Sequence, residues 1–512
     1  MANRNKSSAK IITLVICFII IPLILVLLAV HPAAADVPKH YTEIPARKPP
    51  EIKLPDYQQF QLKNGMKVYF MEDHELPLVS GTLLVRTGSR HEPRDQVGLA
   101  NLVATVMRTG GTATYSGEQL NQVLEQKAAS IESGMAVNSG SVSFSALSED
   151  LPQVLRLFAE VVQKPDFPQK KLDLAKFQIR GSIARRNDEP DDIAAREFRK
   201  LIYGNDNPYA RTVEYATLDN ISREDLISFH QTQFNPNQMI LGIAGDFNPV
   251  TLRSQVEAEL GGWKADRVRL DLTKLAQTKT PLNIRLRSRT DWQNPVQAEK
   301  GGVFFVNQPQ LNQSSIQLGH LGGVVKDPDY PALSILNEVM NGLGGRMFNE
   351  VRSRQGLAYS VYASWSPQFD FPGLAIAGGE TKSASTVSFV KSVIQELKRV
   401  REQPITAIEL QRAKDSVINS FIFNFQDPAQ TLSRLIRYDY FGYPQDFIFQ
   451  YRKAVEATTA ADVQKAAKKH LKPDQIVTLV VGNEKEIQPA LATLNQPVKQ
   501  LDITIPQPKA TS

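Results

Sequence analysis

The sequence predicts an α+β protein that contains two similar units in tandem, and three observations support this prediction. The chain has 512 residues, which is more than one hydrophobic core ordinarily holds. Short apolar or alternating segments, typical of strands, are separated by longer segments whose apolar residues recur every three or four positions, as in amphipathic helices. The order of these segments in the first half of the chain recurs in the second half.

Three short patterns mark the duplication, because each of them occurs twice at a nearly constant separation. The first lies inside a predicted helix, the second is a helix break that contains proline, and the third precedes an apolar strand that ends in glycine. The paired segments are 174–176 with 412–414, 188–190 with 426–428, and 235–238 with 472–475. Several patterns at one separation indicate an internal repeat, so the two units are expected to fold alike.

The elements of the first unit follow from local signals. Two apolar strands that flank an Asn64-Gly65 pair predict a hairpin. Ser116 is suited to N-cap a helix that runs to about Ala129. We further expect strands over 79–85, 139–147 and 239–244, helices over 98–109, 151–162, 170–186, 191–201 and 252–260, and another helix after the capping pattern at 222–225.

The predicted domain organisation has six parts. A signal peptide or membrane anchor and a Pro-rich spacer precede the first unit, a polar linker without periodicity joins the two units, and a Pro-containing tail outside the core ends the chain. In order, the boundaries are 1–35, 36–57, 58–265, 266–302, 303–487 and 488–512.

The N-terminal segment has the features of an export signal. Residues 11–30 form an uncharged apolar run, preceded by basic residues and followed by Ala33-Ala34-Ala35. This order is typical of a cleaved signal peptide. The run is also long enough to span a bilayer as an uncleaved anchor, so both outcomes are open. In either case we expect the body of the protein to be exported, and to be periplasmic or anchored on the extracytoplasmic side of the membrane.

Charge and cysteine content exclude some classes of function. The net charge is +6, but Arg4, Lys6 and Lys10 precede the apolar run, and the rest of the chain has 56 basic and 53 acidic residues. Without a basic block or a basic-aromatic stripe, no nucleic-acid partner is expected. Cys17, the only cysteine, lies inside the apolar run, so we expect neither a disulfide nor thiol chemistry in the exported body.

Residues 97–111, VGLANLVATVMRTGG, are helical in character and end in a glycine pair. They resemble the zinc helix of the insulinase/pitrilysin peptidases, the inverted zincins, in which GLAH-x-x-E-H-M places two histidines and a general-base glutamate on one helix face. Asn101, Ala104 and Thr105 occupy those three positions in this chain. An amide, a methyl group and a hydroxyl replace neither two imidazole ligands nor a carboxylate base.

The remaining residues offer no obvious substitute for that metal site. The resemblance implies a third ligand, a glutamate just before the proline-containing break, and Ser182 occupies its position. No two of the seven histidines are spaced to lie on adjacent helical turns. We therefore expect this chain to bind no metal, with a ligand set from distant positions as the open alternative. His91-Glu92 is interpreted as a surface pair near a turn.

Other catalytic patterns are also missing from the sequence. It has no G-x-S-x-G elbow, no S-x-x-K motif in the context of the penicillin-binding proteins, and no catalytic cysteine. The glycine-rich segment 342–345 is not followed by Lys and Ser or Thr. It therefore does not match a phosphate-binding loop, and we interpret it as a break between two helices.

Residues 347–361, MFNEVRSRQGLAYSV, resemble the second signature of the same family, in which an arginine and a tyrosine seven residues apart precede a strand. Arg352 and Tyr359 match that pair. The resemblance implies that they hold the substrate backbone and the developing oxyanion as fixed hydrogen-bond donors. The alternative is that Arg352 caps a helix C-terminus and Tyr359 lies at the edge of the core. Arg354 is interpreted as a solvated residue.

The resemblance covers about residues 59–482, and segments 313–316 and 326–330 also match its second half. It implies two homologous insulinase/pitrilysin-type domains, each a mainly antiparallel sheet with packed helices, that form a two-lobed half-shell. It also implies a zinc-less subunit of a heterodimeric peptidase, similar to the mitochondrial processing peptidase group. The expected partner is a homologous subunit that carries H-x-x-E-H and the zinc, and the expected substrate is an unfolded peptide that adds as a strand to a sheet edge.

Two other functions fit the same residues. One is a structural scaffold or peptide-binding protein without a role in proteolysis. The other is an autonomous metallopeptidase with an unrecognised metal site. Zinc content and the effect of replacing Arg352 and Tyr359 distinguish these functions, and we expect no peptidase activity from the chain alone.

Overall fold

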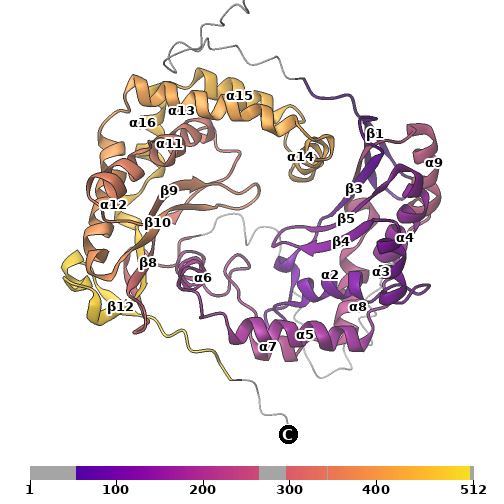
Figure 1. The fold of residues 1–512 in the computed structure, drawn as a ribbon, viewed down its shortest axis with the longest axis horizontal. Coiled ribbons are helices and arrows are strands. Elements are labelled where there is room, and N and C mark those ends of the chain that lie inside the picture. The colour runs from indigo at the N-terminus through magenta and orange to yellow at the C-terminus, as the bar shows by residue number, and fades with distance from the viewer. Residues whose placement is uncertain (1–52, 265–295, 343, 508–512) are drawn as a thin grey trace, which may run out of the picture. The chain divides into compact units, whose positions relative to one another are not determined.

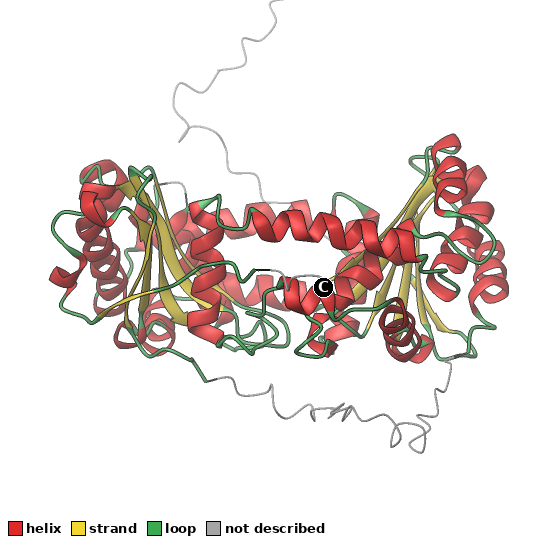
Figure 2. Ribbon diagram, turned by 90° about the horizontal axis from the view of Figure 1, so that it is seen from below, coloured by secondary structure: helices red, strands yellow, loops and turns green. Residues whose placement is uncertain are grey.

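The computed structural model describes residues 53–264, 296–342 and 344–507, and two six-stranded sheets organise this part of the chain (Figures 1 and 2). In spatial order, the first sheet consists of β1 (Gln58–Gln61), β2 (Lys67–Glu72), β6 (Met239–Gly245), β3 (Leu78–Val85), β5 (Gly140–Leu147) and β4 (Ser130–Met135). The second consists of β12 (Val498–Gln500), β7 (Gly302–Asn307), β11 (Val477–Gly482), β8 (Gln313–Leu321), β10 (Leu374–Lys382) and β9 (Ser360–Ser366).

The two sheets confirm the predicted duplication and the predicted α+β class. Neighbouring strands are antiparallel, except that β2 is parallel to β6 and β7 is parallel to both β11 and β12. From β2 to β4 the spatial order matches that from β7 to β9 strand by strand. The predicted hairpin around Asn64-Gly65 is the antiparallel pair β1–β2.

Helices cover both sheets, and Figure 2 shows them in red against the yellow strands. The first half contains α2 (Leu99–Thr109), α3 (Gly117–Gln126), α4 (Leu151–Gln163), α5 (Gln169–Ala184), α6 (Pro190–Tyr203), α7 (Tyr215–Asp219), α8 (Arg223–Gln233) and α9 (Pro249–Leu260). The second half contains α11 (Tyr330–Asn341), a π-helical turn (Phe348–Arg354), α12 (Thr386–Glu402), α13 (Ala407–Ser420), α14 (Pro428–Phe441), α15 (Phe447–Ala457) and α16 (Ala460–His470).

Each half has a core of its own between its sheet and its own helices. In the first half, alternate residues of β5 are buried, and α4 turns its apolar side chains toward the same sheet. In the second half, α11, α12 and α16 bury their apolar faces together with the inner residues of β8 and β10. Strands with a period of two and helices with a period of 3.6 thus share an apolar layer in each half.

One helix of each half packs on the sheet of the other half, and the two helices have equivalent positions in the repeated unit. Pro190 and Pro428 stand at the first helical position after the paired breaks, where proline is tolerated because its missing N–H has no helical partner anyway. Helix α6 of the first half packs on β8 and β11 of the second sheet, and α14 of the second half packs on β6 and β2 of the first (Figure 1). Each sheet therefore receives one helix from the other half.

Three features differ from the sequence prediction. Ser116 does form a capping box with Gln119, but the helix that it begins ends at Gln126, and Ala128 has a left-handed φ of 46°. Strand β4 was not predicted, because only one of its six residues, Ile131, is buried. The tail after residue 487 was expected to lie outside the core, but Leu491 is buried in the core of the second half and residues 498–500 add the edge strand β12.

The predicted anchor or signal segment, most of the spacer and most of the linker lie outside the described residues. Within the described ranges, no helix is long and apolar enough to cross a membrane.

Candidate functional site

Helix α2 carries the positions that resemble a zinc helix, and the structure separates them by exposure. Gly98 precedes the helix in a left-handed conformation that favours glycine. Asn101 and Thr105 are exposed and one turn apart, so they share a helix face. Ala104 is only 3% exposed, and its carbonyl accepts a hydrogen bond from the Ser133 hydroxyl of β4 at 2.6 Å. The helix is thus fixed against the edge strand of the first sheet.

Glu92 holds the beginning of α2, which corrects its interpretation as part of a surface pair. Its side chain is buried, and Oε1 accepts a hydrogen bond from the Ala100 backbone N–H at 2.7 Å. Burial raises the pKa of Glu92 to about 7, although the backbone N–H groups of Ala100 and Gly98 favour the carboxylate. His91 is exposed, as predicted. Glu92 therefore caps the beginning of α2, and His91 is a surface residue.

Ser182, which occupies the third ligand position, is also unsuited to a metal. It is exposed on α5, and its hydroxyl donates to the Gln178 carbonyl one turn earlier at 3.3 Å. The four positions that correspond to ligands and base therefore carry an amide, a methyl group and two hydroxyls. None of them is a carboxylate, an imidazole or a thiolate, the groups that hold zinc in proteins. Zinc does not fit this site.

Among the described residues, the structure brings together one group of three side chains that are able to bind a metal, Asp327, Asp329 and His470, whose ligand atoms lie within 4.8 Å of one another. His470 Nε2 is 2.9 Å from Asp329, and the Lys469 ammonium is 2.6 Å from the same carboxylate. Hydrogen bonds from Lys469 and His470 hold the pKa of Asp329 below its usual range. Because the protein's own cations already compensate these acids, we interpret the group as an ion-pair cluster between the start of α11 and the end of α16.

Arg352 and Tyr359 lie on either side of a loop that leads into β9, the edge strand of the second sheet. Arg352 is exposed, and its guanidinium lies 5.0 Å from the centre of the Phe348 ring. Tyr359 is 73% exposed, while its backbone N–H donates to Glu380 at 3.0 Å and so extends the pairing of β9 with β10. The backbone at Tyr359 is fixed and its phenol projects into solvent.

This geometry argues against the structural alternative for the pair. A tyrosine at the edge of the core would bury most of its ring, and an arginine that caps a helix would bond to terminal carbonyls. The Arg352 side chain instead forms no ion pair or hydrogen bond with a described residue. The neighbouring Arg354 is paired with Glu350 at 2.7 Å and is exposed, which agrees with its interpretation as a solvated residue.

Two cavities in the described part of the chain lie elsewhere. One, of about 280 Å³, is lined by the end of α4, the loop 164–167 that follows it, and α8, and includes Arg223 and Trp263. The other, of about 570 Å³, lies between Asn187, the end of β7 and residues 500–504. Neither is lined by a residue of α2 or by Arg352 or Tyr359, and both side chains of the pair are exposed.

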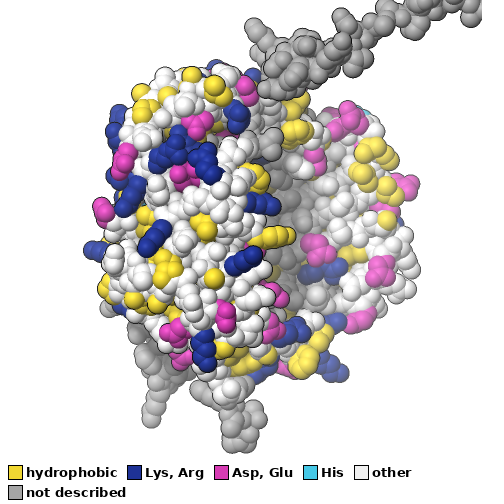
Figure 3. All heavy atoms as spheres, turned by 60° about the vertical axis from the view of Figure 1, so that its left-hand side comes forward, with side chains coloured by type: hydrophobic (Ala, Val, Ile, Leu, Met, Phe, Trp, Pro, Cys, Tyr) yellow, Lys and Arg dark blue, Asp and Glu magenta, His cyan; other side chains and the backbone are white. Residues whose placement is uncertain are grey.

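Helices α12 and α16 carry a basic surface that the sequence did not reveal. Figure 3 shows a face of the molecule with several basic side chains close together. Five exposed lysines on these helices have no ion pair to a described residue. Lys391 and Lys398 lie on α12, Lys465 and Lys468 lie on α16, and Lys472 lies just after α16. Lys465, Lys468 and Lys472 lie within eight consecutive residues of the sequence. Lys391 and Lys398 come from α12, which packs against α16.

Both halves of the chain match models of one protein family, and similar proteins are known from bacteria. The family model described as "Insulinase (Peptidase family M16)" matches residues 67–216, and the one described as "Peptidase M16 inactive domain" matches residues 220–417. The chain is 23% identical over 382 residues to the "Uncharacterized zinc protease YmxG" of Bacillus subtilis, covering 74% of this chain and 86% of that protein. It is 22% identical over 433 residues to the "Non-peptidase homolog YmxG" of Helicobacter pylori, covering 82% and 92%.

Solved structures show the same fold. A peptidase M16 inactive domain from Pseudomonas fluorescens is similar with a TM-score of 0.71 and 24% identity, over 84% of this chain and 98% of that chain. A protease from Helicobacter pylori is similar with a TM-score of 0.70 and 16% identity, over 84% of this chain and 100% of the other.

Proposed function

The chain belongs to the insulinase family of peptidases (peptidase family M16), and from that premise we propose that it is the zinc-less subunit of a heterodimeric M16 peptidase. It is an inactive member of the family, because the positions for the ligands and the base carry groups that neither bind zinc nor take a proton from water. A homologous subunit with an intact H-x-x-E-H contributes the metal and the base.

The observation that carries the proposal is the contrast between the two signatures. The metal signature on α2 is lost, while Arg352 and Tyr359 are both present and exposed beside an edge strand. A guanidinium only donates hydrogen bonds, and a phenol hydroxyl donates one as well. Both groups stabilise a carbonyl oxygen on which negative charge develops. An extended peptide that pairs with a sheet edge has a fixed register, so its carbonyl groups lie at fixed positions along that edge. Retention of these donors without a metal is useful in a chamber shared with a partner.

The test is a reconstitution. The chain alone is expected to contain no stoichiometric zinc and to cut no peptide, and addition of the H-x-x-E-H homologue should create or strongly raise peptidase activity. Arg352→Ala and Tyr359→Phe should each lower turnover of the mixture by about 10²–10³-fold, the usual effect of removing an oxyanion donor. Assembly, followed by size-exclusion chromatography, should not change.

Arg354→Ala is the matched control, because Arg354 lies two residues from Arg352 but is paired with Glu350. It should leave turnover within about twofold, as expected for an exposed ion pair. If Arg352→Ala and Tyr359→Phe both keep the full rate, the chain is a scaffold or a peptide-binding protein. Tight one-to-one zinc in the purified chain alone would instead identify an autonomous metallopeptidase.

We also propose that the body of the protein is exported. The basis is the apolar run at residues 11–30 and the three alanines that follow it. The mass of the mature N-terminus distinguishes a cleaved signal peptide from a retained anchor.

A further inference from the structure

The C-terminal segment binds to the second sheet in a way that the duplication does not account for. In the first sheet, the strand outside β2 is β1, which immediately precedes it in the chain and is antiparallel to it. The equivalent place outside β7 is taken by β12, which comes from the far end of the chain and is parallel to β7. The edge of β7 is therefore an acceptor for a strand that does not belong to the repeated unit.

Backbone hydrogen bonds fix the register of this strand. The Val303 N–H donates to the Pro497 carbonyl at 3.1 Å, and the Leu501 N–H donates to the Phe305 carbonyl at 2.8 Å. These bonds alternate along β7, as expected for a parallel ladder. The three residues of β12 are themselves exposed, so main-chain pairing rather than side-chain burial holds this part of the segment.

Beyond β12, side chains continue the contact toward the first half. Leu501 and Ile503 pack against the apolar cluster between α6 and the second sheet, and Ile505 packs against the core of the first half. Asp502 and Thr504, between them, are exposed. An extended segment with every second residue apolar thus runs from one half of the protein to the other.

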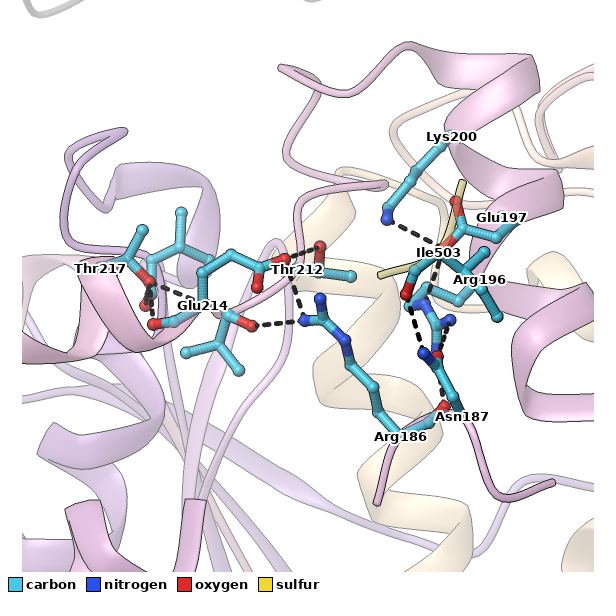
Figure 4. Close-up of polar contacts among 11 residues, drawn as sticks. Arg186, Asn187, Arg196, Glu197, Lys200, Thr212, Glu214, Thr217 and Ile503 are labelled. Atoms are coloured by element: carbon cyan, nitrogen blue, oxygen red, sulfur yellow. Dashed lines mark hydrogen bonds and ion pairs between the residues drawn. The ribbon is translucent and has the colours of Figure 1, made fainter. Parts of the chain in front are cut away.

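Asn187 is the polar end of this site, and Figure 4 shows how it is held. Its Nδ2 donates to the Ile503 carbonyl at 2.8 Å, and its Oδ1 accepts from Arg196 at 2.7 Å. Arg196 also donates to the Arg186 carbonyl at 2.6 Å, and Arg186 pairs with Glu214 at 2.9 Å. Arg196 thus links Asn187 to the backbone of the loop between α5 and α6 while the Asn187 amide contacts the C-terminal segment.

We propose that the outer edge of β7, together with the Asn187 amide, is a strand-binding site whose occupant is this chain's own residues 497–505. The site recognises an extended segment with apolar side chains at alternate positions, through main-chain pairing and one amide bond. The occupied site links the two halves of the protein, so the C-terminal segment acts as a clasp.

The first test removes the clasp and returns it as a separate molecule. A chain that ends at Gln496 should bind a fluorescent peptide of residues 497–507 in anisotropy titrations, and the full chain, whose site is occupied, should not. A peptide with Leu501, Ile503 and Ile505 replaced by Ser is the control and should not bind. Asn187→Ala in the shortened chain should weaken peptide binding by about 2–10-fold, the usual effect of one hydrogen bond. Equal binding to the full and shortened chains, or no binding to either, would contradict the proposal.

The second test keeps the chain complete, so it holds even where the shortened chain does not fold. Hydrogen exchange of the amides in residues 302–305 and 497–503 should become faster in Asn187→Ala and in Ile503→Ser. Exchange in β4 and β5, which are in the other sheet, should stay unchanged. If the amides of β7 exchange at the wild-type rate in both variants, β12 is not held as proposed.

Discussion

Ala104 shows at the scale of one residue why the metal helix is not simply an unoccupied site. The residue at the position that resembles a general base is buried on α2, which packs on β4, and has 3% of its surface exposed. A carboxylate at this place has neither the room nor the solvent that it needs. The helix has therefore adapted to its structural role.

Ala104→Glu is expected to lower the free energy of unfolding by about 2–4 kcal/mol, because it overpacks the layer and buries a charge. Asn101→Glu, on the same helix but exposed, should change it by less than about 0.5 kcal/mol. Urea unfolding followed by circular dichroism measures both. Equal stability of the two variants would mean that α2 can still accept a base at position 104.

Glu92 gives the first half a pH dependence of known sign. Its pKa is raised by burial from 4.5 to about 7. Between these pH values the folded carboxyl keeps a proton that the unfolded carboxyl has lost. The contribution of Glu92 to the free energy of unfolding is therefore fully present below about pH 4.5 and is lost as the pH rises through about 7. A difference of this size corresponds to about 3 kcal/mol.

Glu92→Gln is expected to remove that pH dependence, because an amide does not titrate. The stability of the wild type relative to this variant should fall by about 3 kcal/mol between pH 4.5 and pH 8, as measured by urea unfolding at each pH. The exposed Asp95→Asn variant serves as the control and should follow the wild type. Parallel curves for the wild type and Glu92→Gln would show that Glu92 is ionised in the folded protein without cost.

At the scale of elements, the exchange of α6 and α14 holds the two halves together. Helix α14 approaches the first sheet closely at Gly242, where an added Cβ would lie 3.2 Å from atoms of Leu432 and Ile436. The contact therefore depends on a glycine in β6 and on branched apolar residues in α14. Neither signal was distinctive in the sequence, since apolar strands and amphipathic helices occur throughout the chain.

Ile436→Ala is expected to lower the free energy of unfolding by about 2–4 kcal/mol, because Ile436 is fully buried between α14 and the first sheet. Ile408→Ala is matched in chemistry, but Ile408 on α13 is 72% exposed, and its loss should cost less than about 0.5 kcal/mol. Chemical denaturation compares the two. A small effect of Ile436→Ala would mean that α14 detaches from the first sheet easily.

The elements themselves were largely predictable. The strand around residue 142 and helix α4 have clear periods of two and 3.6, and the structure places both within one or two residues of the expected bounds. Strand β4 was missed because an edge strand with one buried residue has no apolar period. The basic surface on α12 and α16 was not predicted; three of its five lysines lie at 465–472, and only the packing of α12 against α16 adds Lys391 and Lys398.

At the scale of the whole molecule, Asp370 joins the halves by polar contacts. It lies in the loop between β9 and β10, and its carboxylate is 2.8 Å from Arg90, 2.6 Å from the Asn138 amide and 3.2 Å from the Tyr209 hydroxyl. All three donors belong to the first half. The adjacent Phe371 stacks on Tyr209 with ring centres 4.2 Å apart.

Asp370→Ala should lower the free energy of unfolding by about 1–3 kcal/mol, because it leaves three donors without their acceptor. Asp206→Ala removes a comparable pair with Arg94 whose side chains are 53% and 76% exposed, and it should cost less than about 0.5 kcal/mol. Thermal unfolding at low and moderate salt compares them. If the two variants are equally stable, the loop between β9 and β10 contributes little to the contact between the halves.

The sequence by itself determined the duplication, most of the strands and helices of the first unit, and the replacement of the ligand positions by Asn101, Thr105 and Ser182. These properties depend on residue identity and on periodicity over short segments, which are local. The tertiary structure alone decided that α6 and α14 exchange sheets, that residues 498–500 complete the second sheet, and that Glu92 caps α2. Each of these contacts pairs segments of ordinary composition, and only the packing of the whole chain selects which of many similar apolar surfaces meet.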